Sequence, residues 1–283
     1  MHIMIIDIHT HIFPPEMRVD RQKYFSLDPV FELLYRSPKS KMIGAQEIVA
    51  AMDEQGVDKS VVFGFPWINA DTFRRHNDYV NEAVCRFPDR LIGFGCCDPF
   101  HPDASREAQR CLESGLSGIG ELAFYQSGID EDVLERLSPI MDLCHSKDRP
   151  VLIHTNEPVG HKYPGKSPNT LRQIYELVRR FSRNKIILAH WGGGIFFFQL
   201  LKKEVQATLE NVYFDTAASP FLYHNKIYPI AVRLAGLEKI LLGSDFPLIK
   251  PSRYIDELKS SGLPPKEIES ICGLNAIRLL NIK

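Results

Sequence analysis

The chain has 283 residues, of which 44% are hydrophobic, and a formal net charge of −1. This length can bury one large core or two small ones, and the charge balance leaves no excess of cations for a nucleic acid backbone. The apolar start lacks a basic leading region, so we expect no signal peptide. No run of about 18 apolar residues predicts a transmembrane helix. Six cysteines without a CxxC pair are typical of reduced thiols in a cytoplasmic protein.

Short β-rich runs alternate with helical patterns along the whole chain. The runs are almost continuously apolar, as parallel strands buried on both faces are. They cover residues 3–8, 60–65, 91–97, 117–121, 150–154, 185–190, 211–215 and 239–245. Eight strands that alternate with helices favour an α/β fold of the (β/α)8 TIM-barrel type, with its active face at the carboxyl ends of the strands.

Helical stripes separate these runs. Ala45, Ile48 and Met52 recur at helical spacing and predict a helix that ends at Gly56. Asp103 is placed to cap a later helix.

A doubly wound sheet is the main alternative to the barrel, but it would need a glycine-rich turn after the first strand. The stretch "DIHTHIFPP" holds no glycine, so we predict one barrel domain over residues 1–283, with the insertion at 12–44 as a pocket wall or lid.

Ionisable side chains stand at the predicted strand ends. Taken singly, a histidine there is often structural, a glutamate can be a solvated turn acid, and an aspartate can cap a turn. Together they would converge on one mouth of the barrel, where buried imidazoles need partners for their nitrogens. A divalent cation supplies such partners. The candidate ligands are His9, His11, Glu121, His154, His190 and Asp245.

Several motifs around these residues resemble the amidohydrolase superfamily. They are "DIHTH" in the first strand, "IHT" in the fifth, "LAHWGG" in the sixth and "LLGSDFP" in the eighth. The closing "GLNAIRLL" looks like the last helix of the branch that contains aminocarboxymuconate semialdehyde decarboxylase and many uncharacterised hydrolases. The resemblance spans nearly the whole chain and implies a metal-dependent barrel enzyme.

The resemblance also implies roles for the ligands. His9, His11, His154 and Asp245 would hold one divalent metal, zinc by default and manganese as the alternative. His190 would polarise the attacking water or the substrate, or bind a second ion. Glu121 resembles the bridging glutamate of TatD-like deoxyribonucleases, so a second ion stays open.

The predicted function is hydrolysis of a small-molecule amide, lactone or ester. A bound cation would lower the pKa of a water molecule toward ~7, and Asp245 and His190 would be the catalytic residues, as proton shuttle and oxyanion stabiliser. Asp7 shares a strand face with His9 and His11. We expect it to orient one of their imidazoles, although it can equally fix the strand backbone.

Further residues are candidates for substrate binding. The loop after the fifth strand can close over the mouth, or can simply be solvated. Trp67 and Trp191 follow strands and can form an aromatic wall, or can pack inside the fold. The loop candidates are His161, Tyr163 and Lys166.

Other functions stay open from the sequence. The main alternative is a lyase that decarboxylates an aromatic or enoic acid, with Asp245 protonating carbon. Phosphodiester hydrolysis is disfavoured by the neutral charge balance, and a catalytically inactive binding protein is disfavoured because the ligand set is complete. We expect a small-molecule substrate, no nucleic acid or membrane partner, and a cytoplasmic protein that can form a homodimer.

Overall fold

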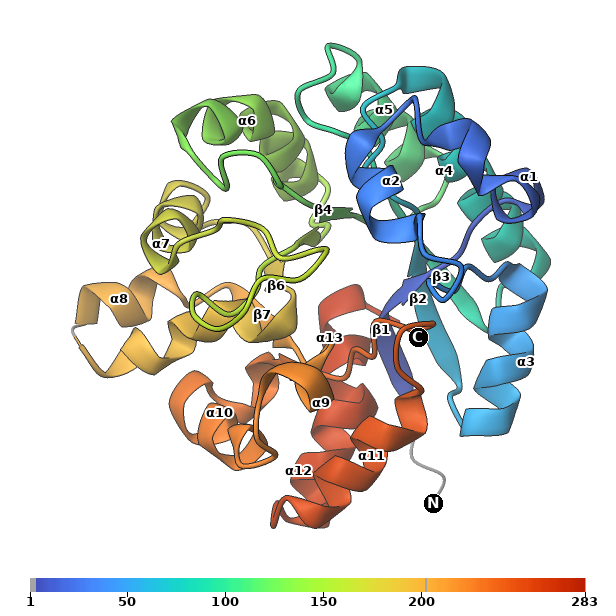
Figure 1. Ribbon diagram of the computed structural model, residues 1–283. Helices are drawn as coiled ribbons and strands as arrows, with labels where there is room; N and C mark the ends of the chain where they lie inside the picture. The colour runs from blue at the N-terminus through green and yellow to red at the C-terminus, as the bar shows by residue number, and fades with distance from the viewer. Residues whose placement is uncertain (1–3, 202, 283) are drawn as a thin grey trace.

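The computed structural model describes residues 4–201 and 203–282 and shows eight parallel strands arranged as a barrel (Figure 1). Each strand pairs with the next one along the chain, in the order β1 to β8. The TIM-barrel prediction is therefore confirmed, while residue 3 of the first predicted run lies outside the described residues. The strands are β1 (Ile6–His11), β2 (Lys59–Phe63), β3 (Leu91–Gly95), β4 (Gly118–Leu122), β5 (Val151–Ile153), β6 (Ile186–Leu188), β7 (Val212–Asp215) and β8 (Ile240–Leu241).

The segment after β8 runs beside β1 and closes the barrel. The amide of Ile8 donates to the carbonyl of Leu242 at 2.9 Å, and the amide of Asp245 donates to the carbonyl of His9 at the same distance. A further bond joins the amide of His11 to the carbonyl of Phe246 at 2.9 Å. These bonds join the carboxyl half of β1 to the segment that follows β8.

Helices surround the strands in Figure 1. Gly56 ends α3 in the left-handed conformation, as the sequence predicts. Asp103 precedes α5, but its side chain makes no capping bond there. None of the helices in the described residues is long and apolar enough to span a bilayer. The helices between strands are α3 (Ala45–Gln55), α4 (Ala70–Arg86), α5 (Ala104–Glu113), α6 (Glu131–Ser146), α7 (Leu171–Arg180), α8 (Lys203–Thr208), α9 (Ser219–Leu222) and α10 (Ile227–Ala235), and those after β8 are α11 (Pro251–Ser260), α12 (Pro265–Glu269) and α13 (Asn275–Leu280).

The core has two parts. A large cluster fills the space between the strands and the helices. A smaller cluster joins apolar side chains of six strands with Ala276 and Leu279 of α13. Side chains of so many strands meet only inside a barrel, so this cluster fills its interior and leaves the opposite end for polar residues.

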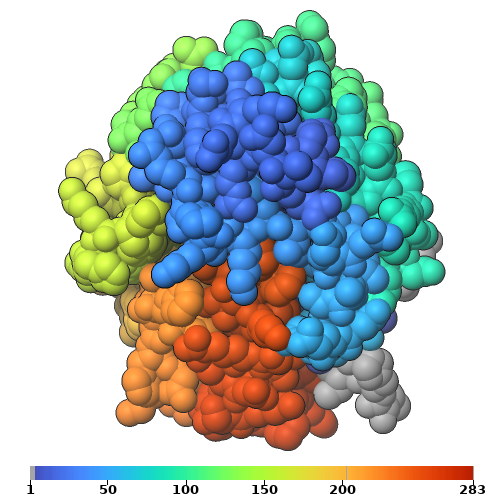
Figure 2. Space-filling view, turned by 45° about the vertical axis from the view of Figure 1, so that its right-hand side comes forward, coloured from blue at the N-terminus to red at the C-terminus, as the bar shows by residue number. Residues whose placement is uncertain are grey.

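The insertion at residues 12–44 carries short helices of its own: α1 (Pro15–Val19) and α2 (Pro29–Tyr35). Asp28 caps α2 by accepting from the amides of Val30 and Phe31 at 2.9 and 3.1 Å. The ring of Phe31 then packs on Trp67, with centroids 4.3 Å apart. In Figure 2 the insertion, in blue, covers the upper middle part of the visible face. It is thus a folded segment rather than an open loop, and its role as a pocket wall or lid stays a prediction.

Candidate metal centre

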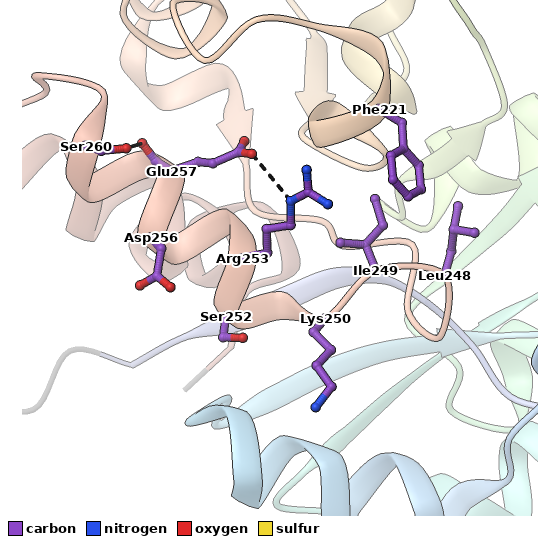
Figure 3. A pocket seen from close by; sticks show the side chains of 9 residues that line it. All are labelled: Phe221, Leu248, Ile249, Lys250, Ser252, Arg253, Asp256, Glu257 and Ser260. Carbon is purple, nitrogen blue, oxygen red and sulfur yellow. Dashed lines mark hydrogen bonds and ion pairs between the residues drawn. The ribbon is translucent and has the colours of Figure 1, made fainter.

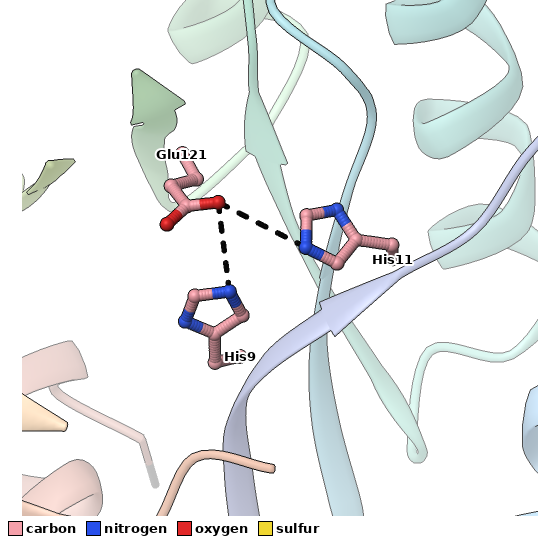
Figure 4. Close-up of side chains that lie close together, drawn as sticks. All are labelled: His9, His11 and Glu121. Carbon is pink, nitrogen blue, oxygen red and sulfur yellow. Dashed lines mark ion pairs between the residues drawn. The ribbon is translucent and has the colours of Figure 1, made fainter. Parts of the chain in front are cut away.

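The carboxylate of Glu121 lies at the middle of the predicted ligand set. Its Oε2 atom is 3.6 Å from His9 Nε2 and 3.9 Å from His11 Nε2 (Figure 4). Its Oε1 atom is 2.9 Å from His154 Nδ1 and 3.7 Å from His190 Nε2. One carboxylate, on β4, therefore faces four imidazoles from the ends of three other strands, β1, β5 and β6.

Asp245 completes the cluster from the segment after β8. Its Oδ1 atom lies 3.3 Å from His11 Nε2 and 3.8 Å from His9 Nε2. Overlapping triplets of potential ligand atoms, within 4.8 Å of one another, together include all six predicted residues. The structure thus brings together side chains that lie up to 236 positions apart in the sequence.

Two nitrogen atoms in the cluster are buried and unpartnered within the described residues. They are His9 Nε2 and His11 Nδ1. A buried polar atom without a partner is costly, and native proteins retain one mainly where a ligand or water satisfies it. His9 Nε2 also faces two carboxylates, and imidazole with carboxylate is a donor set that suits zinc, manganese or iron. The residues present therefore fit a divalent cation.

Partners on the outer side of the rings determine which nitrogen faces the cluster. His190 Nδ1 lies 3.0 Å from the carbonyl of Ala217, which only accepts, so Nδ1 donates and Nε2 presents its lone pair. His154 has the reverse arrangement: its Nε2 lies 2.9 Å from the carbonyl of Gly165, and its Nδ1 faces Glu121. Such outer bonds fix the orientation of metal-binding histidines.

Asp215, at the end of β7, is a residue that the sequence analysis missed. Its Oδ2 atom lies 2.8 Å from His9 Nδ1, and its Oδ1 atom accepts from the amides of His190 and Ala217 at 2.8 and 3.0 Å. Its signal was present, since it ends a predicted strand like the other acidic residues. It is the carboxylate that orients an imidazole of the centre.

The structure favours the backbone role of Asp7 over the orientation of an imidazole. Its carboxylate accepts from the amide of His9 at 3.2 Å, from the amide of Ser244 at 2.9 Å and from the hydroxyl of Ser244. Asp7 therefore ties β1 to the segment after β8, because the backbone groups and the hydroxyl of Ser244 occupy its oxygens. This is the backbone role that the sequence had left open.

Two of the six residues have an unfavourable backbone conformation. His190 has φ of 54° and Asp245 has φ of 59°, values at which a side chain is strained by about 1–3 kcal/mol. Strain of this kind is concentrated at functional sites. At Gly193, with φ of +61°, an added Cβ would lie 2.6 Å from the carbonyl oxygen of Asn156, so this turn requires glycine.

Charges within the cluster shift its pKa values in opposite directions. Burial alone would raise the pKa of Glu121, but His9 and His154 outweigh it and hold that pKa well below its usual range. Burial and the neighbouring charge of His154 lower the pKa of His190. The cluster thus combines an ionised glutamate with a neutral imidazole, which are the forms that bind a cation.

Two tyrosines that the sequence analysis missed lie beside the cluster. The Tyr125 ring is 5.5 Å from the His154 ring, centroid to centroid. Tyr35, from α2 of the insertion, stacks on Phe31 at 4.8 Å. Burial raises the pKa of both phenols, and Glu121 raises it further, so both are neutral hydrogen-bonding groups. No sequence pattern marks either position.

The predicted tryptophans lie deep in the fold. Both are fully buried, and each indole N–H already has a partner: Trp67 donates to His76 Nδ1 at 2.9 Å and Trp191 to the hydroxyl of Ser219 at 2.8 Å. Neither therefore offers a free donor or an exposed face. The structure favours the packing role for both, and their contact with substrate gains no support.

The loop after β5 lies against the cluster through the carbonyl of Gly165. His161 is exposed, whereas Tyr163 and Lys166 are partly buried and both bond Glu157 of the same loop. The part of these side chains in substrate binding stays a prediction.

A separate surface pocket of about 640 Å³ lies between the short helix α9, which carries Phe221, and helix α11 (Figure 3). Two of its lining residues, Arg253 and Glu257, lie one turn apart on α11 and form an ion pair, with Nε and Oε1 3.7 Å apart. None of the six ligand candidates lines this pocket. It is therefore distinct from the metal centre.

Curated relatives cover nearly the whole chain. The 2-amino-3-carboxymuconate-6-semialdehyde decarboxylase of Dictyostelium discoideum is 26% identical over 98% of this chain and 91% of its own. The gamma-resorcylate decarboxylase of a Polaromonas species is 22% identical over 86% of this chain and 90% of its own. Both are named as decarboxylases, so the prediction of a hydrolase is wrong and the lyase alternative is favoured.

Solved structures share the fold. The 5-carboxyvanillate decarboxylase of Sphingomonas paucimobilis superposes with a TM-score of 0.78 over 100% of both chains, at 18% identity. A 2,6-dihydroxybenzoate decarboxylase from Rhizobium gives a TM-score of 0.73 over 99% of both chains, also at 18% identity. The Amidohydrolase family model matches residues 6–282. With its barrel, its converging histidines and this match, the chain belongs to the amidohydrolase family.

Proposed function

We propose that this enzyme catalyses the metal-dependent, non-oxidative decarboxylation of an aromatic or enoic carboxylic acid. The observation that carries the proposal is the match, over nearly the full length of the chain, to two curated decarboxylases. The geometry supports it, because Asp245 lies beside the histidine cluster and keeps 18% of its side chain exposed at the barrel mouth.

His9, His11, His154 and Asp245 would hold the cation, with Glu121 and His190 beside them. When bound, a divalent cation supplies positive charge that binds and polarises the oxygen atoms of the substrate. Manganese is the first ion to test, because a dihydroxybenzoate decarboxylase from a Polaromonas species and a 5-carboxyvanillate decarboxylase were solved with it. We expect one ion per chain, and a measured second ion would make Glu121 a bridge.

The chain's own residues supply binding and proton transfer. Burial would raise the pKa of Asp245, but His11 and His9 outweigh it and lower that pKa, so its carboxylate is ionised before the substrate binds. In the proposed reaction it takes up a solvent proton when the anionic substrate binds beside it, and delivers that proton to the carbon that bears the carboxylate. The bond between that carbon and the carboxylate then breaks, its electron pair restores the ring or the double bond, and carbon dioxide leaves. Asp245 is left as the carboxylate and takes up a solvent proton again when the next substrate binds.

Other residues position the substrate. His190, neutral and held by Ala217, directs its Nε2 lone pair into the cluster. Tyr35 and Tyr125 are neutral phenols that can hydrogen-bond hydroxyl or carbonyl groups of the substrate. Phe13 and Phe31 are fully buried and pack against Tyr35, so they hold its ring in place beside the site.

The test is a substrate panel with direct detection of carbon dioxide. Protein loaded with manganese is incubated with 2,6-dihydroxybenzoate, 5-carboxyvanillate and enoic dicarboxylates, and the products are identified by mass. We expect carbon dioxide and the substrate less one carboxyl group from at least one class. Absence of release from every aromatic and enoic acid, with metal bound, would contradict the proposal. The cytoplasmic location and the homodimer stay predictions.

A further inference from the structure

The loop between β5 and α7, residues 154–170, is closed on itself. Asn156 and Ser167 join its two ends: Asn156 Oδ1 accepts from the amide and the hydroxyl of Ser167 at 2.8 and 2.7 Å. Asn169 also donates to the carbonyl of His154 at 3.1 Å. These buried bonds make the base of the loop rigid, so the conformation of its tip is set by contacts within the loop.

An ion pair fills the inside of the loop. Lys166 Nζ lies 2.6 Å from Glu157 Oε1, 2.9 Å from the carbonyl of Val159 and 3.3 Å from the carbonyl of His161. Each proton of the ammonium thus has an acceptor. The second oxygen of Glu157 accepts from the hydroxyl of Tyr163 at 2.8 Å. The charged side chains are only 13% and 14% exposed, so solvent screens this pair little.

The ion pair adjoins the loop's contact with the metal centre. Gly165 directly precedes Lys166, and its carbonyl lies 2.9 Å from His154 Nε2. Gly165 has φ of +94°, a conformation that favours glycine. Because neighbouring residues share a peptide unit, the position of Lys166 determines where the Gly165 carbonyl points.

We propose that Glu157 and Lys166 are positioning residues that act through His154. Their ion pair holds the Gly165 carbonyl on His154 Nε2, and that bond keeps Nδ1 directed at Glu121 and the cation site. The inference rests on the cation site of the proposed function but not on the reaction catalysed there. It gives Lys166 a role other than contact with substrate, because its donors are already used within the loop.

Cation affinity is the direct readout of this role. Loss of a partner that orients a metal-binding histidine typically weakens metal binding by about 10- to 100-fold. We therefore expect Lys166→Met and Glu157→Gln each to raise the dissociation constant for Mn²⁺ in this range, measured by titration of metal-free protein. Lys166→Arg keeps the charge and the donors, and should bind Mn²⁺ more tightly than Lys166→Met.

The double variant tests whether the two residues act as a unit. If both act through one ion pair, Glu157→Gln with Lys166→Met weakens Mn²⁺ binding no more than the stronger single change. The double variant also leaves no buried charge unpaired. It can therefore be measured even if a single variant fails to fold. Lys162→Met is the matched control, because Lys162 is exposed in the same loop, and it should bind Mn²⁺ like the unmodified protein.

Two results would overturn the inference. One is Mn²⁺ affinity that is unchanged in folded Lys166→Met and double variants. The other is a raised KM with unchanged Mn²⁺ affinity, which would make Lys166 a substrate contact instead. Either result leaves the proposed function intact, since the unmodified protein still binds the cation and releases carbon dioxide. Failure of the unmodified protein to bind any divalent cation would overturn both proposals.

Discussion

His9 Nδ1 lies 2.8 Å from Oδ2 of Asp215, although the two residues are 206 positions apart in the chain. Both side chains are completely buried. The carboxylate accepts at Nδ1 and so leaves Nε2 of His9 facing Glu121 and Asp245 without a hydrogen bond. The pair couples the end of β1 to the end of β7 and prepares one nitrogen for a cation.

Asp215→Asn should weaken the metal centre. The amide has one acceptor oxygen in place of two, so it cannot serve both the imidazole of His9 and the amides of His190 and Ala217. We expect Mn²⁺ affinity to fall about 10- to 100-fold, measured by titration of metal-free protein. Asp256→Asn, on the exposed face of α11, is the control. Equal Mn²⁺ affinity in Asp215→Asn and Asp256→Asn would show that Asp215 does not support the metal centre.

Asp245→Asn should abolish most turnover, because an amide cannot deliver the proton that replaces the carboxyl group. The loss expected for a missing general acid is about 10²- to 10⁴-fold in kcat. Carbon dioxide release is measured at saturating Mn²⁺, so that a change in metal affinity does not mimic the effect. A rate near that of the unmodified protein would assign proton delivery to another group.

Removal of the cation should lower both activity and thermal stability. A ligand that binds only the folded state stabilises it by about 2.7 kcal/mol at a free concentration of 100 times Kd. We expect chelation to stop carbon dioxide release and lower Tm, and Mn²⁺ to restore both. Thermal unfolding is followed by circular dichroism with and without chelator. An unchanged Tm and rate after verified metal removal would contradict the cation site.

The stability of the fold should depend on pH through His76. Burial lowers its pKa to about 4 from 6.5, so the folded protein holds it neutral while the unfolded chain binds a proton below 6.5. Its contribution to the free energy of unfolding is therefore present above pH 6.5 and is lost as pH falls toward 4, by up to about 3 kcal/mol.

Urea unfolding is measured across this pH range for the unmodified protein and for His76→Gln. The free energy of unfolding should fall less with pH in the variant. His145→Gln, which is exposed, should follow the unmodified protein, and equal slopes in all three would refute the assignment.

Gly56→Ala and Gly193→Ala together separate the cost of a left-handed backbone conformation from the cost of a steric clash. Gly193→Ala adds a Cβ that would lie 2.6 Å from the Asn156 carbonyl, whereas Gly56→Ala has a similar φ and nothing within 4 Å. Gly56→Ala should cost only the left-handed strain, about 1–2 kcal/mol in free energy of unfolding. Gly193→Ala should cost more, because the turn after His190 must also shift. Equal losses in denaturant unfolding would show that the contact at Gly193 relaxes freely.

The barrel could be predicted from the sequence because its strands and helices are marked by local patterns. Apolar runs alternate with helical stripes, and each run corresponds to an observed strand, although β8 is shorter than predicted and its segment continues as an irregular pairing with β1. The ligand candidates were found because polar residues at the ends of apolar strands are rare and easy to see. Pattern alone thus selected six residues that the structure brings together, while their roles as ligands stay a prediction.

Sequence patterns could not predict contacts between residues that lie far apart in the chain. Trp67 and Trp191 follow strands just as the histidines do, yet both turn into the packed core, because the chain leaves the pleated pattern at the strand end. Asp7 shares a face with His9 but bonds Ser244, whose position depends on barrel closure. Tyr35 approaches the centre only through the fold of the insertion, for which no periodic pattern exists.

The bonds that join β1 to the segment after β8 also set an order of events in biosynthesis. His9 is synthesised 236 residues before Asp245, and the bonds between their two segments can form only once both are present. A nascent or truncated chain that ends before residue 245 therefore carries the histidines without the aspartate that completes the cluster. If the six residues bind a cation as proposed, tight cation uptake would require a closed barrel and would report complete folding.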